Sequence, residues 1–204
     1  MGNPYDYDTC IRLMEKKGKE LFGAHFQIAE TDKPLIKRLL VYFLKDSDNA
    51  RKQNIFLTKG ILLAGPVGCG KTAIMTLLRL FQIPEERFIL KTCRDISFEF
   101  YQDGFSVIQK YGRGNFGKDM LRSCCFDDLG TENNLKYYGN ECNVMAEILL
   151  TRYDYYVSHR LITHLTTNLN SSEIETQYGL RVRSRMREMF NLISFPQESK
   201  DKRS

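Results

Sequence analysis

The chain has 204 residues, of which 42% are hydrophobic and 27% charged, and this is the balance of an ordinary globular protein. Its formal net charge is +5, from 30 basic and 25 acidic side chains, so an anionic partner is permitted but not required. No apolar run approaches the roughly eighteen residues of a membrane span, and we expect a cytoplasmic protein that does not contact a membrane.

Apolar side chains recur at helical spacing over residues 5–22 and again over 33–45, ahead of an apolar strand at 60–64. Strands and helices then alternate along the rest of the chain. We predict helices at 71–81, 95–111, 141–158 and 180–190, and strands at 87–92, 122–127, 161–167 and 190–195. Such alternation predicts a parallel sheet with helices on both of its faces.

The length suits one well-buried α/β domain of roughly 150–200 residues with an appended segment. We expect a short helical N-terminal arm over residues 1–30, a core domain over 31–196 and a polar C-terminal tail over 197–204. The six cysteines include no C-x-x-C pair, which argues against a zinc site. Cys124 and Cys125 are adjacent on a predicted strand, so their side chains should point to opposite faces as small buried groups.

Residues 65–72 read GPVGCGKT and match the phosphate-binding pattern G-x-x-x-x-G-K-[ST] at every required position. A strand before this pattern and a helix after it form its usual context, in which backbone N–H groups and the helix N-terminus surround phosphate oxygens. Lys71 is expected to reach the β- and γ-phosphates, and Thr72 to offer its hydroxyl to Mg²⁺. The residues expected to contact ATP are Gly65, Pro66, Val67, Gly68, Cys69, Gly70, Lys71, Thr72 and Ala73.

An acidic element follows in CCFDDLGTE, residues 124–132. Asp127 closes the predicted strand and is placed to hold Mg²⁺, directly or through water. Asp128 is placed to orient or deprotonate the attacking water, with Glu132 as the alternative for that role. On its own this segment would equally suit an acidic surface turn. Together with the phosphate loop, it predicts the metal-binding half of an ATPase site.

The segment LTTNLNSSEI, residues 165–174, ends a strand in TTN. Because ligands of parallel sheets bind at the carboxyl ends of the strands, Asn168 is placed near the nucleotide, where its amide can position water or sense the γ-phosphate. An Asx turn or a helix cap would also use an asparagine here. Arg181 and Arg185 share one face of the next helix, which is either a solvated basic helix or the source of an arginine for a neighbouring subunit's γ-phosphate.

In this order the motifs GPVGCGKT, FDDLGTE, LTTNL and RVRSRM resemble those of the AAA+ ATPases, and more closely those of DnaC/DnaI-type helicase loaders and the related IstB-type transposition helpers. The likeness spans about residues 24–196. It implies an α/β P-loop NTPase fold, a three-layer sandwich with a five-stranded parallel sheet in the order 5-1-4-3-2. It also implies that Asn168 is the sensor-1 residue and Arg185 the arginine finger, with Arg181 beside it, in a homo-oligomer that binds ATP between subunits.

The chain departs from the AAA+ pattern in two places. Many AAA+ proteins carry Asp-Glu where this chain has Asp127-Asp128, and the shorter second acid is expected to slow hydrolysis. Few residues follow the helix of Arg185, so we expect a C-terminal lid that is minimal or absent. The expected reaction is a slow, Mg-dependent hydrolysis of ATP to ADP and phosphate.

Binding to single-stranded DNA requires cations interleaved with aromatic surfaces on which the bases stack. The glycine-rich segment YGRGNFGK offers such a set in Tyr111, Arg113, Phe116 and Lys118. The family that the chain resembles contacts DNA from this general region. An ordinary surface loop would have the same composition, so the two interpretations carry equal weight.

We expect an ATP-dependent accessory protein of DNA replication that acts on single-stranded DNA or on a replicative helicase. An IstB-like helper ATPase that partners a transposase is the close alternative. Alternatives from other classes are a small-molecule kinase on the same scaffold and a nucleotide-dependent switch with negligible turnover. ATP turnover stimulated by DNA would separate the first two from the others, whereas phosphate transfer to nucleosides would favour the kinase.

Overall fold

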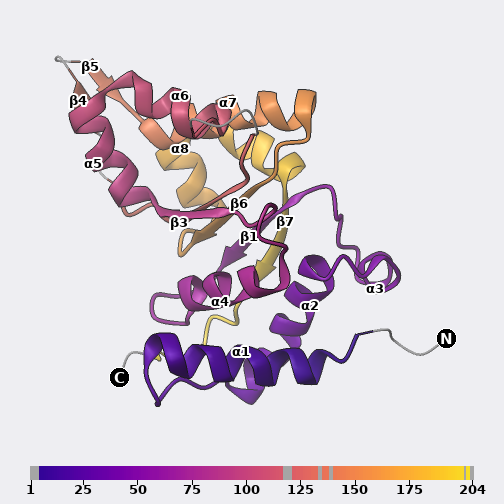
Figure 1. Ribbon diagram of the computed structural model, residues 1–204. Helices are drawn as coiled ribbons and strands as arrows, with labels where there is room; N and C mark the ends of the chain where they lie inside the picture. The colour runs from indigo at the N-terminus through magenta and orange to yellow at the C-terminus, as the bar shows by residue number, and fades with distance from the viewer. Residues whose placement is uncertain (1–4, 117–120, 133–134, 138–139, 200, 203–204) are drawn as a thin grey trace.

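The computed structural model describes residues 5–116, 121–132, 135–137, 140–199 and 201–202. Figure 1 shows a central sheet with helices on both faces, which are the three layers predicted from the sequence. The strands of this sheet are β1 (Gly60–Ala64), β2 (Ile89–Thr92), β3 (Cys124–Leu129), β6 (Thr163–Thr167) and β7 (Phe190–Ser194). They lie in the order β2-β3-β6-β1-β7, and every neighbouring pair is parallel. Counted along the chain and read from the other edge, this is the predicted order 5-1-4-3-2, which is confirmed.

Side chains of the buried strands alternate between two hydrophobic clusters, one on each face of the sheet. Ile61 and Leu63 pack into the first cluster, whereas Leu62 between them packs into the second. Cys125 belongs to the first cluster and Cys124 to the second, as the period-two geometry of a strand requires. The predicted opposite orientation of the two cysteines is therefore confirmed, and both are fully buried.

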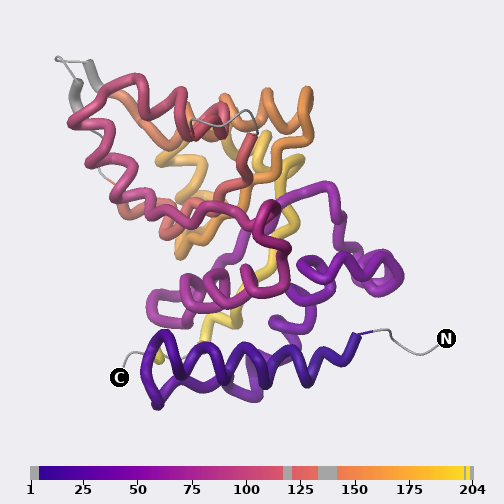
Figure 2. Tube along the Cα trace, viewed as in Figure 1, coloured from indigo at the N-terminus to yellow at the C-terminus, as the bar shows by residue number. Residues whose placement is uncertain are grey.

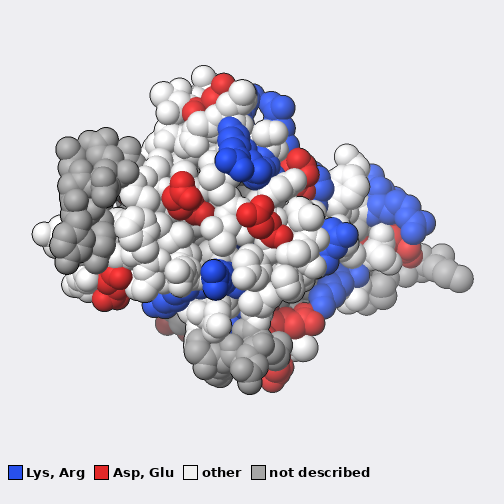
Figure 3. Space-filling model, turned by 90° about the horizontal axis from the view of Figure 1, so that it is seen from above, with Lys and Arg blue, Asp and Glu red and all other residues white. Residues whose placement is uncertain are grey.

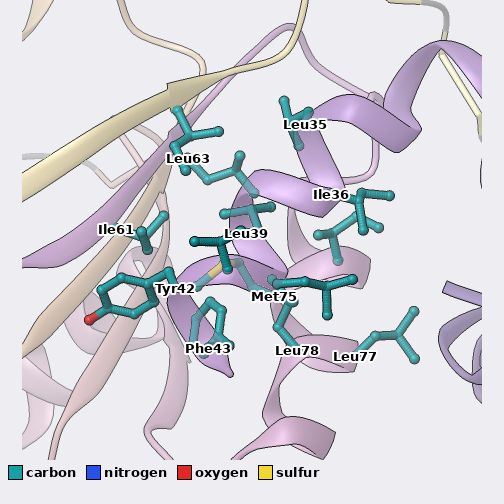
Figure 4. Close-up of a cluster of buried hydrophobic side chains, with 14 of the residues drawn as sticks. Leu35, Ile36, Leu39, Tyr42, Phe43, Ile61, Leu63, Met75, Leu77 and Leu78 are labelled. Atoms are coloured by element: carbon teal, nitrogen blue, oxygen red, sulfur yellow. The ribbon is translucent and has the colours of Figure 1, made fainter. Parts of the chain in front are cut away.

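The first cluster lies under the N-terminal helices. These helices are α1 (Tyr7–Phe22), η1 (Glu30–Asp32), α2 (Lys33–Phe43), α3 (Ser47–Lys52), α4 (Lys71–Leu78) and η2 (Arg79–Phe81). Figure 4 shows side chains of α2, β1 and α4 packed together, among them Leu39, Leu63 and Met75. Helix α1 adds Ile11 and Met14 to the same cluster. The N-terminal segment therefore packs on the core through its own apolar face.

The second cluster lies under α5 (Cys93–Asp103), α6 (Phe105–Arg113), α7 (Val144–His159) and α8 (Ser171–Met189). The helix predicted over 95–111 is interrupted at Gly104, whose φ of +63° separates α5 from α6. Helix α8 begins before the predicted residue 180, because the Asn170 side chain accepts the N–H of Glu173 while the Glu173 carboxylate accepts that of Asn170. Gly179, at φ +85°, then breaks the helix before its arginines.

A small antiparallel ribbon of β4 (Leu135–Tyr137) and β5 (Asn140–Cys142) follows β3 and was not expected from the sequence. Both strands are only three residues long, so they carry too little periodicity to be recognised. Among the described residues, no helix combines the length and the apolar character needed to cross a bilayer.

His164 lies on the central strand β6 and is almost completely buried. Its Nδ1 accepts the N–H of Ile61 at 3.0 Å, and its ring lies 4.9 Å from that of Phe88 and 5.5 Å from that of Phe43. Burial, assisted by the charge of Arg152, lowers the pKa of this imidazole to about 3. His164 is therefore a neutral core residue.

We predict that His164 stays neutral in the folded protein from pH 8 down to pH 5. Because an unfolded histidine binds a proton near pH 6.5 and the folded one does not, its contribution to stability is complete above pH 6.5 and falls as the pH decreases toward 3. The slope approaches about 1.4 kcal/mol per pH unit within that range. Histidine proton NMR across a pH titration checks this. A His164 resonance with a midpoint near 6.5 would contradict it.

Candidate nucleotide-binding site

The phosphate loop joins strand β1, next to the central strand β6, to helix α4 at the carboxyl edge of the sheet. Two of its residues, Gly68 at φ +80° and Gly70 at φ +98°, adopt the left-handed conformation that side chains with a Cβ rarely enter. The motif's glycines are thus required by backbone geometry, and α4 begins directly after them at Lys71. The strand and helix predicted to flank this loop are both present, so α4 presents its N-terminal dipole to the loop.

Lys71 is buried and lies along its own loop. Its Nζ donates to the carbonyl of Gly65 at 2.9 Å and to that of Pro66 at 3.0 Å. An ammonium group held at the loop is placed to meet phosphate oxygens. Cys69 is fully buried, and burial raises the pKa of its thiol, so it is a packing residue of the loop and no nucleophile.

The carboxylate of Asp127 connects the phosphate loop to the neighbouring strands. Its Oδ2 accepts the hydroxyl of Thr72 at 2.8 Å, and its Oδ1 accepts the hydroxyl of Thr166 at 2.6 Å. Burial raises the pKa of Asp127, whereas the two hydroxyls and the Lys71 charge oppose that shift. The predicted pair of Thr72 and Asp127 is thus brought together, with Thr166 as a third member.

Asp128 follows at a bend in β3. Its φ is +54°, and the pairing with β6 shifts register between Phe126 and Leu129. The N–H of Asp128 donates to the hydroxyl of Thr166 at 2.8 Å. The half-buried side chain of Asp128 lines a cavity beside the phosphate loop. One threonine therefore orients both consecutive acids.

Glu132, the alternative for orienting water, has a different role. It is buried, and its carboxylate accepts the hydroxyl of Tyr178 and, at 3.0 Å, the N–H of Gly130. These contacts join the end of β3 to α8 and raise the pKa of Tyr178 through burial and the adjacent charge. The geometry therefore favours Asp128 over Glu132 as the acid that faces the nucleotide.

A cavity of about 650 Å³ lies beside the phosphate loop. Its walls come from the loop and α4, from Asp128, from Lys202 near the C-terminus and from the segment after α1, where Phe22 and Phe26 lie with ring centroids 5.4 Å apart. A second cavity of about 680 Å³ shares Gly65 with the phosphate loop but is lined by neither Lys71 nor Thr72. We therefore assign the nucleotide to the first cavity.

Asn168 directly follows β6 and is exposed. It lines the second cavity, together with Gly65 and Pro66 of the phosphate loop. It thus lies at the carboxyl edge of the sheet, as predicted, next to the loop rather than within the first cavity. Its sensor role stays a prediction.

Arg181 and Arg185 of the RVRSRM motif lie on α8 after its break at Gly179. The guanidinium of Arg185 stacks on the ring of Tyr153 in α7 at 4.8 Å, and its Nε is buried without a hydrogen-bond partner among the described residues. Arg181 is exposed. Neither arginine lines the cavity of its own chain, so a contact with nucleotide would have to involve another subunit.

The structure corrects the predicted DNA contacts at Tyr111. This residue lies on α6 rather than in a loop, is only 3% exposed, and donates its hydroxyl to the carboxylate of Glu99 at 2.9 Å. Phe116 packs edge-on against it, with centroids 5.5 Å apart. These aromatic rings belong to the core, so Tyr111 cannot stack on a base. Arg113 is exposed at the end of α6, and Lys118 lies outside the described residues.

The donors present fit a magnesium nucleotide. Gly68, at φ +80°, holds the loop in a backbone conformation that residues with a Cβ rarely adopt, and backbone N–H groups of a loop of this kind suit an anion. The hydroxyl of Thr72 and the carboxylate of Asp127 are hard oxygen ligands already in contact, which is the chemistry that Mg²⁺ prefers.

We predict that Lys71→Ala weakens ATP binding by about tenfold or more, because it removes a charged donor from the phosphates. Lys45→Ala, which removes an exposed ammonium paired with Glu86, is the matched control and should bind as the wild type does. Calorimetric titration with ATP measures both, and thermal unfolding shows that each variant is folded. Equal affinity of folded Lys71→Ala and wild type would contradict this assignment of the site.

Solved structures with a similar fold include DnaI, at 17% identity over 85% of this chain and 89% of that one, with a TM-score of 0.56. A candidate primosome component from Streptococcus pyogenes serotype M3 is similar over 96% of this chain and all of its own, at 14% identity and a TM-score of 0.58. The DnaC helicase loader matches over 68% of this chain and 79% of its own, at 21% identity and a TM-score of 0.46. No protein-family model and no curated protein matches the sequence. The chain therefore shares the α/β fold of DnaI and of the candidate primosome component, with the five-stranded parallel sheet that its motifs implied.

Proposed function

We propose that the chain is a Mg-dependent ATPase of the AAA+ type that serves DNA replication as a helicase-loader-like accessory protein. One observation carries this proposal. A single buried carboxylate, that of Asp127, accepts hydroxyls from the phosphate-loop helix and from the strand that precedes Asn168. Residues from three of the four motifs therefore meet at one point beneath a cavity large enough for a nucleotide.

The residues have separate tasks at this point. Backbone N–H groups of the loop and Lys71 bind the phosphates. Thr72 and Asp127 would hold Mg²⁺, which would supply positive charge to offset the charge that develops on the phosphates. Asp128 orients the attacking water from the cavity wall, and its backbone N–H is fixed by Thr166. Asn168 reports on the γ-phosphate from the adjacent edge.

Completion of the site in an oligomer is supported by the position of Arg185. Within one chain, the Arg185 guanidinium stacks on the ring of Tyr153 in α7. The hydroxyl of that tyrosine donates at 2.9 Å to Glu188, which lies on α8 with Arg185. A stacked arginine keeps its charge while its planar donors stay preorganised. We place Arg185, with Arg181 beside it, against the γ-phosphate bound by a neighbouring subunit.

The partners follow from the motif resemblance and from the fold shared with DnaI and the candidate primosome component. We propose that the protein acts on single-stranded DNA or on a replicative helicase. On the face that Figure 3 shows, acidic and basic side chains are interspersed. A DNA strand on this face would therefore meet separate cations rather than a continuous basic surface.

We predict that Arg185→Ala lowers ATP turnover by about a thousandfold while ATP still binds, because an arginine supplied by a neighbour stabilises charge in the transition state. Arg185→Lys should not restore turnover, since lysine lacks the planar guanidinium. Arg51→Ala, an exposed arginine on α3, is the matched control. Steady-state phosphate release and ATP titration measure the two effects. Turnover by Arg185→Ala within threefold of the wild type would contradict the oligomeric site.

A further inference from the structure

The residues that follow β7, the C-terminal segment, run beside the end of β1 and reach the phosphate loop. Phe195, the residue after β7, donates its N–H to the carbonyl of Ala64 at 2.9 Å. Farther along, the N–H of Lys202 donates to the carbonyl of Gly68 at 3.1 Å. In Figure 2 the yellow end of the chain runs to the C-terminus beside the last turn of α1. Asp201 and Lys202 of the predicted polar tail thus lie against the phosphate loop.

The side chain of Lys202 makes three contacts at this place. Its Nζ donates to the carbonyl of Cys69 at 2.8 Å, pairs with the carboxylate of Asp32, and lies 5.2 Å from the ring centroid of Phe195. Neighbouring Asp201 packs so closely that a Cβ added to Gly68 would lie 2.2 Å from its carboxyl group. Asp201 and Lys202 therefore contact the loop at Gly68 and Cys69.

Asp32 anchors this arrangement to the rest of the core. It closes η1 immediately before α2, and only 2% of its surface is exposed. A buried carboxylate is costly unless it is paired, so the ion pair with Lys202 favours the docked position of the segment. Residues 170 positions apart in the chain are thereby joined directly across the phosphate loop.

Lys202 binds the carbonyl of Gly68 through its backbone N–H and that of Cys69 through its Nζ, and these contacts orient the N–H groups of the same two peptide bonds. In a trans peptide the C=O and the following N–H lie on opposite sides of one rigid plane, and the described residues include no cis peptide. With the carbonyls of Gly68 and Cys69 turned toward Lys202, the N–H groups of Cys69 and Gly70 are turned away from it, and that of Cys69 also donates to the carbonyl of Pro66 at 3.5 Å. Preorganised N–H groups of this kind are what a phosphate-binding loop requires.

We infer that Lys202 is a positioning residue of the nucleotide site, which fixes the phosphate loop in its anion-binding conformation through the carbonyls of Gly68 and Cys69. The inference rests on the proposed function, because the ligand is the phosphate group of ATP. Lys202 acts through the loop and is tied to Asp32.

The test compares ATP affinity of the full chain with that of Lys202→Ala, Lys202→Arg and Asp32→Asn by calorimetric titration. We expect Lys202→Ala to weaken binding about tenfold, because it removes a charged donor from the loop. Lys202→Arg, which retains donors and charge, should recover most of the affinity, and Asp32→Asn should lose an intermediate amount. Lys59→Ala is the matched control, since its ammonium also donates to a backbone carbonyl, that of Arg187.

The outcomes are distinguishable. If the wild type binds ATP and Lys202→Ala binds it equally well, the positioning role fails while the proposed function stands. Tighter binding by Lys202→Ala would also overturn it, since the segment would then be blocking the cavity. If the wild type binds no ATP, the proposed function fails and the inference fails with it. Thermal unfolding identifies a folded variant, and Lys202→Arg keeps the test valid if Lys202→Ala does not fold.

Discussion

The hydrogen bonds of Asp127 to Thr72 and Thr166 are the interaction on which the candidate site depends. They join β3 to the first turn of α4 and to β6, so three separate chain segments are positioned by one carboxylate. A buried carboxylate tolerates this location because both of its oxygens are satisfied by hydroxyl donors. In the proposed function, the same carboxylate would also hold Mg²⁺, so one side chain would serve both the local structure and the metal site.

The parallel sheet explains why these residues converge. Every strand of a parallel sheet has its carboxyl end at the same edge, and β1, β3 and β6 are neighbours around the centre. The phosphate loop, the acidic pair and Asn168 each follow one of these strands. Their positions after these strands were therefore enough to predict that they meet, and the alternation of strands with helices along the chain predicted the layers that support them.

Other parts of the site depend on contacts between distant residues, which no local pattern reveals. Tyr111 is of a residue type that can stack on DNA bases, yet its helix places the ring in the core. Its backbone carbonyl there accepts a hydrogen bond from Arg152 at 2.8 Å. The contact of Thr166 with Asp127 was not predicted, because threonines are common on strands. The position of Thr166 near the end of a strand, two residues before Asn168, was the feature that could have indicated it. The role of Lys202 could not be predicted from the sequence, since its ion pair with Asp32 forms only when the fold brings the two residues together.

The most direct test of the central claim is ATP turnover by the wild type and by Asp127→Asn, each measured with Mg²⁺ in the presence and absence of single-stranded DNA. Asparagine keeps the shape of aspartate but removes the charge that would hold the metal. Our account predicts slow turnover by the wild type that increases with DNA, and little or none by Asp127→Asn under either condition. Turnover that is indifferent to both the substitution and the DNA would contradict it.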